Sequence, residues 1–360
     1  MITLDGSHLE GGGQLVRTAL ALSVITGKAF EVTKIRHGRK QPGLKAQHLH
    51  CVEALKKLCG AEVEGCELGS EYLKFVPGKI VPKTIPVDIG TAGSVSLLLQ
   101  SLLLPGMFAG GKVRYKIRGG TDGKWAMPYD FMKEVLFPQL RRYVDLDLTL
   151  VKRGYYPKGG GEIDLKIKAR TLFTGIDTAE LPIINILEQG HLMQIRGVSH
   201  ASSELSAAQV AERQANAAKH LLLKFNVPVS IDVQYADTLS AGSGITLWAI
   251  FSRHHDEVDV ANPIRLGADA LGERGKRAEV VGEEAAKKLL DEIESGAAVD
   301  AHTADNLVPF IALFGGAIRT SEITDHTRTM LYVIKEFLGD CIEIDDKEKI
   351  LRRNNCVTAI

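Results

Sequence analysis

Two histidines near the C-terminus stand where an imidazole can act as a nucleophile. One lies in His302-Thr303-Ala304-Asp305-Asn306 and the other in Thr324-Asp325-His326-Thr327. The apolar pattern predicts that each segment opens a helix, and the helix dipole there disfavours the charged imidazolium and favours the neutral, nucleophilic ring. A capping or surface histidine is the alternative interpretation of each residue.

A glycine-rich segment near the N-terminus is suited to an anion. Glu10 precedes Gly11, Gly12 and Gly13, which open a predicted helix. Backbone N–H groups can approach an anion at such a helix start. No Gly-Lys-Ser/Thr follows, so this is not a P-loop. A carboxylate at Glu10 makes sense if a divalent cation bridges it to a phosphate, and a tight turn with a solvated glutamate is the alternative.

The segment from Lys34 to Lys45 carries five cations and no acid. Its Arg36 and Arg39 can clamp a phosphate through paired hydrogen bonds. The corresponding segment after Arg118 lacks these charges, so the repeat described below does not itself require them. A solvated basic loop remains the alternative.

A third glycine-rich segment runs from Arg153 to Glu162 and reads Arg-Gly-Tyr-Tyr-Pro-Lys-Gly-Gly-Gly-Glu. Its residues fit an anion site and a structural bend before a strand equally well.

An internal repeat indicates how these residues are positioned. Lys34-Ile35-Arg36-His37-Gly38-Arg39 recurs as Lys116-Ile117-Arg118-Gly119-Gly120-Thr121. Around each copy, a glycine-rich turn, an apolar helix, a strand and a second helix (44–58; 129–143) follow in the same order. The helices predicted at 304–315 and 327–338, with a strand at 317–323, form a third copy.

The residues between the second and third copies have a different pattern. Strands are predicted at 192–198, 229–233 and 245–251, and helices at 206–225 and 278–294. We therefore expect an α+β protein of three repeated two-helix, four-strand modules with a small inserted α/β domain. Residues 1–184 and 297–360 would form the catalytic domain and 185–296 the insert. The charged, glycine-rich segment 253–277 is expected to be a mobile loop.

Composition narrows the functional class. The 360 residues contain 44 Lys plus Arg and 44 Asp plus Glu, which argues against a protein that coats nucleic acid through bulk charge. The most apolar segment, Val95 to Leu104, is too short to span a bilayer, and no secretory signal is recognised. Five cysteines without a Cys-x-x-Cys spacing argue against a zinc site. We expect a cytoplasmic protein without a membrane partner.

Together these motifs resemble those of the RNA 3′-terminal phosphate cyclases over essentially the whole chain. The most specific match is the segment from Arg153 to Gly161, which looks like the family signature. Supporting matches are Leu4-Asp5-Gly6, Glu10-Gly11-Gly12-Gly13-Gln14, Arg17, Ile35-Arg36, Gly38-Arg39, Pro42-Gly43-Leu44 and Gly119-Gly120-Thr121-Asp122. The resemblance implies three modules related to the enolpyruvyl transferases, together with the inserted domain.

The resemblance also implies a chemistry, that of a ligase forming phosphoric ester bonds. A histidine attacks the α-phosphorus of ATP and keeps AMP, which then moves to an RNA 3′-phosphate. The adjacent 2′-hydroxyl attacks that phosphate and gives a 2′,3′-cyclic phosphate. ATP is thus the co-substrate, Mg²⁺ or Mn²⁺ the metal, and RNA with a 3′-phosphate end the partner. A homo-oligomer is compatible with this interpretation.

Residue by residue, the resemblance assigns the nucleophile to His326. It assigns ATP binding to Gln100, Pro128, His302, Thr303, Ala304, Asp305 and Asn306. It assigns phosphate and RNA binding to Arg17, Arg36, Arg39 and Gln47, and the metal to Glu10. His302 stands where many relatives have tyrosine, and Asn306 where many have glutamine.

Two competing functions remain. A cyclase-like RNA-binding factor without activity would lack the nucleophilic histidine, which this chain keeps at His326. An enolpyruvyl transferase would form no covalent AMP and would not need the signature segment.

Overall fold

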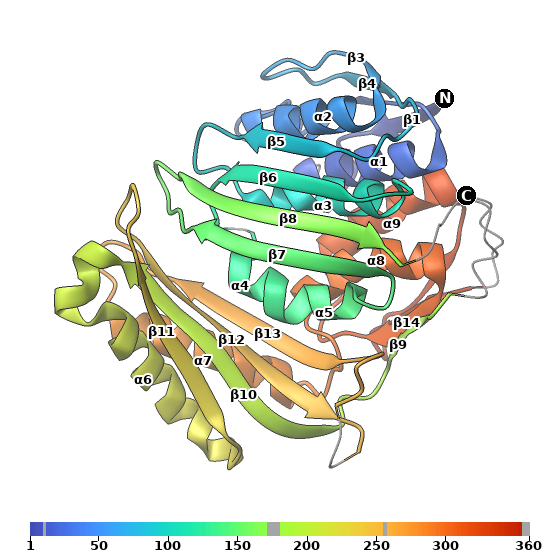
Figure 1. Ribbon diagram of the computed structural model, residues 1–360. Coiled ribbons are helices and arrows are strands. Elements are labelled where there is room, and N and C mark those ends of the chain that lie inside the picture. Colours follow the sequence, from blue (N-terminus) through green and yellow to red (C-terminus); the bar gives the residue numbers. More distant parts are fainter. Residues whose placement is uncertain (10–11, 125, 171–180, 255–257, 355–360) are drawn as a thin grey trace.

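The computed structural model describes residues 1–9, 12–124, 126–170, 181–254 and 258–354. These residues form four four-stranded sheets with helices packed against them (Figure 1). This mixed architecture confirms the predicted α+β fold class.

The first sheet has the strand order β1-β2-β4-β3, in which β1 and β2 are parallel and the other pairs antiparallel. Its strands are β1 (Ile2–Asp5), β2 (Phe30–Thr33), β3 (Glu62–Glu64) and β4 (Leu73–Val76). The accompanying helices are α1 (Gly13–Thr26) and α2 (Ala46–Cys59).

The second sheet repeats this order and these directions as β5-β6-β8-β7. Its strands are β5 (Thr84–Asp88), β6 (Val113–Gly119), β7 (Val144–Lys152) and β8 (Gly161–Ala169). Its first helix is α3 (Val95–Met107). The second helical segment consists of α4 (Tyr129–Phe131), the π-helical turn η1 (Met132–Leu136) and α5 (Phe137–Leu140).

The third sheet, β9-β14-β16-β15, follows the same plan but draws β9 from before the inserted segment. Its strands are β9 (Ile184–Ile186), β14 (Gly316–Arg319), β15 (Ile342–Asp345) and β16 (Ile350–Arg353), and its helices are α8 (Ala301–Phe314) and α9 (Asp325–Leu338). The boundary that we placed between residues 184 and 185 therefore falls inside a strand. The division into domains stays a prediction.

The fourth sheet is built wholly from the inserted segment, in the order β11-β10-β12-β13. Its strands are β10 (His191–Ser202), β11 (Val229–Ala236), β12 (Ser243–Ser252) and β13 (Ile264–Leu271). Helices α6 (Val210–Leu222) and α7 (Ala278–Glu294) pack on it, and short 3₁₀ turns, η3 (Ser203–Ala208) and η4 (Leu223–Phe225), flank α6.

The expectation of a mobile loop at 253–277 is wrong for β13. Ile264, Leu266, Ala268 and Ala270 alternate along this strand and are all buried, and β13 pairs with β12 over its length. Arg265, Gly267 and Asp269 occupy the intervening positions, so charge and glycine masked the period-two pattern of a strand.

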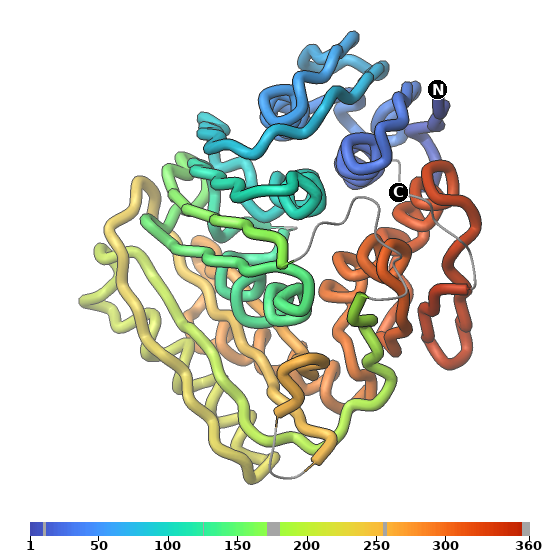
Figure 2. The backbone as a smooth tube through the Cα atoms, turned by 45° about the vertical axis from the view of Figure 1, so that its right-hand side comes forward, coloured from blue at the N-terminus to red at the C-terminus, as the bar shows by residue number. Residues whose placement is uncertain are grey.

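Helices from different sheets meet in a shared core. The almost entirely buried α1 packs against α2, α3 and α9, and α8 packs against α9. The fourth sheet is attached through a smaller apolar cluster, in which Phe131 and Val135 contact Val198, Trp248 and Ile250. Figure 2 shows the same neighbourhood from a second side, with residues 129–140 alongside the fourth sheet. In the described residues, no helix is both long and apolar enough to cross a membrane.

Candidate functional site

A cleft of about 460 Å³ lies where α1, α3, α8 and α9 meet the inserted segment. This volume lies in the range of small-molecule binding sites. Its lining residues include Gln14, Arg17, Leu97, Gln100, Gly123, Lys124, Ala126, Met127, Asp269, Ala270, Leu271, Glu273, Lys276, Glu284, Lys288, His302, Asp305, Asn306 and His326. The cleft thus brings together six residues that were predicted from the sequence to lie in the site. They come from α1, α3, α8 and α9, the helices that accompany three different sheets.

The two histidines occupy equivalent places. His302 is the second residue of α8 and His326 the second residue of α9, and both side chains are exposed and line the cleft. Each helix has an N-cap whose side chain accepts a backbone hydrogen bond, Asp300 for α8 and Thr324 for α9. The prediction that both histidines stand at helix starts is confirmed.

Asp305 fixes the start of α9. Its Oδ1 accepts hydrogen bonds of 2.6 Å from the hydroxyls of Thr324 and Thr327, the residues on either side of the Asp325-His326 pair. Burial raises the pKa of Asp305, and the two hydroxyl bonds oppose that shift. One carboxylate on α8 therefore holds the turn that presents His326 to the cleft.

A row of side chains connects α1, α3 and α8 along the cleft. Arg17 Nε donates to Gln100 Oε1 (2.9 Å), and Gln100 Nε2 donates to Asn306 Oδ1 (3.1 Å). Asn306 Nδ2 in turn donates to the carbonyl oxygen of His302 (2.8 Å). Burial lowers the pKa of Arg17 to about 10, which leaves it a cation at neutral pH. Among the described residues, no carboxylate pairs with Arg17, so this end of the cleft attracts an anion.

The three other residues expected to bind ATP do not line the cleft with their side chains. Thr303 and Ala304 are fully buried, and Thr303 donates both its backbone N–H and its hydroxyl to the Asp300 carboxylate (2.8 Å each). Pro128 stands at the N-cap position of α4, directly after the cleft-lining Met127. The structure therefore brings the neighbours of these three residues to the cleft, and their own side chains are not among its lining.

The basic loop lies beside the cleft, not in its lining. Arg36 Nη1 donates to the carbonyl oxygens of Gln41 (2.9 Å) and Gly43 (3.1 Å), so part of its donor capacity shapes the loop. Arg39 is exposed. Gln47 Nε2 is buried and has no hydrogen-bond partner within the described structure.

His48 connects this loop to the cleft and was missed by sequence reasoning. Burial, together with the charges of Arg17, Arg36 and Lys45, lowers its pKa to about 3. Its Nδ1 accepts a hydrogen bond from the backbone N–H of Lys45 (3.0 Å). A Cβ at Gly13 would lie 2.0 Å from His48 Nε2, so only glycine lets the start of α1 approach this ring. A buried neutral imidazole thus lies near three cations.

Glu10, expected to bind the metal, lies outside the described residues. The inserted segment supplies what sequence reasoning missed: one wall of the cleft. Lys124 Nζ pairs with Glu273 (2.9 Å), Lys276 pairs with Glu284, and Lys288 donates to the Asp269 carbonyl oxygen (2.9 Å). The insert therefore lines the same cleft as both histidines.

In the signature-like segment, Arg153 has a structural role and is not part of an anion site. The side chain is buried, and its Nη1 lies 3.1 Å from both carboxylate oxygens of Asp122 and 3.0 Å from Asp130 Oδ2. Burial by itself would raise the pKa of Asp122, but Arg153 and His200 hold it well below its usual range. Two internal carboxylates therefore occupy this guanidinium, which is not available to an external anion.

Histidines at two helix starts, with an arginine that no described carboxylate neutralises, form a site suited to an enzyme that transfers phosphate-containing groups. The chain belongs to the RNA 3′-terminal phosphate cyclase family, whose model matches residues 8–344. It is 43% identical to the RNA 3′-terminal phosphate cyclase of Pyrococcus abyssi, over 98% of this chain and 99% of that one. It is 44% identical to the cyclase of Thermococcus onnurineus, over 96% of each chain, and 42% identical to that of Archaeoglobus fulgidus, over 98% and 100%.

Proposed function

We propose that this protein converts an RNA 3′-terminal phosphate to a 2′,3′-cyclic phosphodiester at the expense of ATP, through a covalent adenylate on His326. The observation that carries the proposal is the shared cleft, in which His326 and Arg17 lie together in a member of the cyclase family. An exposed imidazole and a cation in one cleft are what nucleotidyl transfer to histidine requires.

In the first step, a ring nitrogen of His326 attacks the α-phosphorus of ATP. The bond from that phosphorus to the bridging oxygen breaks, and pyrophosphate leaves with the electron pair. The Asp305 bonds to Thr324 and Thr327 support this role, because they fix the backbone on both sides of the nucleophile. Arg17 would stabilise the phosphate charge that develops in this step.

The nucleotide is held by the row of polar groups along the cleft. Gln100 and Asn306 present amide groups at its edge, and His302 presents an exposed imidazole on which a base can stack. The rings of Phe131 and His302 pack edge to face with their centroids 6.2 Å apart, which helps to hold the imidazole in place. Thr303, Ala304 and Pro128 act through the backbone positions that they fix.

In the second step, an oxygen of the RNA 3′-phosphate attacks the phosphorus of the histidine adenylate, and the P–N bond breaks. The resulting anhydride converts an oxide, which cannot leave, into AMP, which can. The 2′-hydroxyl next attacks the 3′-phosphorus and loses its proton as AMP departs. Its tethered position supplies a large effective molarity, and DNA lacks this nucleophile. We assign the RNA phosphate to Arg36, Arg39 and Gln47.

A divalent cation, Mg²⁺ or Mn²⁺, belongs to this proposal as the counter-ion of the triphosphate. Glu10 is the residue assigned to it. A carboxylate oxygen is a ligand that both metals accept. When bound, the ion would offset phosphate charge at the start of α1, where Arg17 contributes the protein's own positive charge.

We also propose a reducing compartment, the cytoplasm, as the location. Three of the described cysteines, Cys51, Cys59 and Cys66, are free thiols, which fits such a compartment.

The test is conversion of an RNA 3′-phosphate into an end that resists phosphatase, in the presence of ATP and Mg²⁺ or Mn²⁺. Wild-type protein should form this end, and His326→Ala should not, while both give the same circular dichroism spectrum. Cyclisation by His326→Ala at the wild-type rate would contradict the assigned nucleophile. Absence of cyclisation with retained RNA binding by the wild type would favour an inactive, RNA-binding relative.

A further inference from the structure

We infer that the buried cluster around Arg153 fixes the position of the cleft wall that the inserted segment provides, and that His200 is its positioning residue for nucleotide binding. This inference rests on the proposed function, because it concerns the affinity of the same cleft for ATP. The Arg153 cluster comprises Asp122, Asp130, Arg153, Tyr155 and His200.

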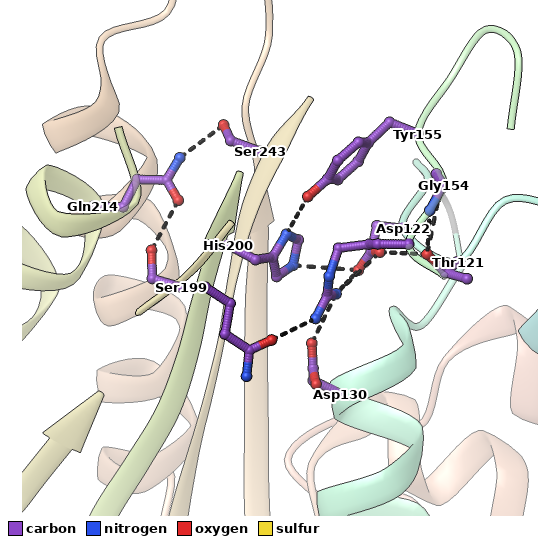
Figure 3. A network of polar contacts seen from close by, with 11 residues as sticks. Thr121, Asp122, Asp130, Gly154, Tyr155, Ser199, His200, Gln214 and Ser243 are labelled. Atoms are coloured by element: carbon purple, nitrogen blue, oxygen red, sulfur yellow. Dashed lines mark hydrogen bonds and ion pairs between the residues drawn. The ribbon is translucent and has the colours of Figure 1, made fainter. Parts of the chain in front are cut away.

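The cluster joins two parts of the chain that have separate sheets (Figure 3). Asp122 follows β6 and Tyr155 follows β7, whereas His200 lies on β10 of the fourth sheet. His200 Nδ1 is 2.7 Å from the Tyr155 hydroxyl, and His200 Nε2 is 3.3 Å from Asp122 Oδ1. Both nitrogens of one imidazole from the insert are therefore engaged by the second module.

The contact between the second module and the fourth sheet depends on buried charges. Two buried carboxylates share one buried guanidinium, and removing Arg153 would leave both of them without their cation in a dry environment. Asp122, Asp130 and His200 are residue types that bind metals, and their ligand atoms lie close together. However, Arg153 Nη1 already lies within 3.1 Å of both carboxylates. The guanidinium takes the position that a cation would need.

The cluster is continuous with the cleft on both sides. Asp122 is followed directly by Gly123 and Lys124, which line the cleft. On the other side, His200 is in register with Gly244 of β12, and Gly244 is in register with the cleft-lining Leu271 of β13.

The contact along this row is close. A Cβ at Gly244 would lie 2.9 Å from His200 Cε1 and 3.0 Å from Leu271 Cδ2, so the imidazole and the leucine meet over the glycine. A displacement of His200 relative to Asp122 is therefore passed to the wall formed by Ala270, Leu271 and Glu273.

His200→Ala tests the inference, with Ser199→Ala as the matched control. Ser199 is the preceding residue of β10 and is also buried, but its hydroxyl faces α6, bonding to the Ala211 carbonyl oxygen (2.7 Å) and to Gln214 Oε1 (3.1 Å). Both variants lose two buried polar contacts of one strand. Only His200→Ala loses the contacts to the second module.

The measurements are the dissociation constant for ATP and the KM and kcat for self-adenylylation, with urea unfolding as the stability reference. His200→Ala should raise both constants for ATP about tenfold, or about 1.4 kcal/mol, and leave kcat within about threefold. Ser199→Ala should leave ATP binding unchanged at a comparable loss of stability. His200→Gln, whose amide can replace both contacts, should restore most of the affinity.

Unchanged ATP affinity in His200→Ala would overturn the inference, as would an equal loss in Ser199→Ala at matched stability. In either case the proposed function would stand, because wild-type protein still binds ATP. A wild-type protein that does not bind ATP would instead contradict the proposed function, and the inference with it.

Discussion

Replacing Asp305 with alanine removes the one carboxylate oxygen that holds the first turn of α9. The Thr327 side chain is fully buried, so its hydroxyl would lose its acceptor where water does not reach, at a cost of about 1–3 kcal/mol. Thr324 is only half-buried, so its hydroxyl can turn to solvent and adds less. Relief of the desolvated carboxylate, whose pKa burial raises, offsets part of this cost. We expect a net loss of about 2 kcal/mol.

Asp305→Asn is the matched variant, because the asparagine carbonyl oxygen can accept the same two hydroxyl bonds. Urea unfolding followed by circular dichroism should place Asp305→Asn within about 1 kcal/mol of wild type. Self-adenylylation should fall in Asp305→Ala and be largely retained in Asp305→Asn. Equal losses of unfolding free energy in both variants would refute the hydrogen-bond argument. An Asp305→Asn protein of normal stability that fails to bind ATP would show that the carboxylate charge itself contacts the nucleotide.

Three further outcomes follow from neighbouring residues. His48→Gln should make the free energy of unfolding less dependent on pH below neutrality. The wild-type ring, with its pKa lowered to about 3, gives stability that is fully present above about pH 6.5 and is lost as the pH falls. This loss amounts to about 2 kcal/mol between pH 7 and 5. An unchanged difference in unfolding free energy between these two pH values would contradict this. His302→Ala should raise the KM for ATP while label still accumulates on the protein at saturating ATP, and complete loss of the adduct at normal ATP affinity would reverse the roles of the two histidines. Arg39→Ala should raise the KM for 3′-phosphate RNA and leave RNA-free adenylylation intact, so a loss of adenylylation would move Arg39 to the nucleotide.

Local patterns predicted much of this fold because they act over short distances. The apolar helices that begin near Gly13, Val95 and Ala301 and the strands between them have clear periodicity, and each helix start carries its own capping residue or glycine. Several helix starts lie close together in the structure. The motifs at these helix starts therefore also predicted residues that meet in the cleft, including His302 and His326.

Contacts between distant segments were not predictable in the same way. The wall formed by Asp269 to Leu271 depends on packing of the fourth sheet against residues 129–136, and no single segment carries a signal for it. Arg153 looked like an anion binder because its carboxylate partners, Asp122 and Asp130, lie elsewhere in the sequence. His48 was not predicted because its burial depends on the packing of α1 against its ring, and the local sequence around a lone histidine on a helix does not indicate that packing.

The central claim, a covalent adenylate on His326, is tested most directly without RNA. Protein would be mixed with Mg²⁺ or Mn²⁺ and ATP labelled at the α-phosphate, denatured, and examined for label by gel and peptide mapping. The account predicts an acid-labile, alkali-stable adduct that maps to His326 and disappears in His326→Ala. A folded wild-type protein that acquires no label with either metal, or acquires it at another residue, would contradict the account.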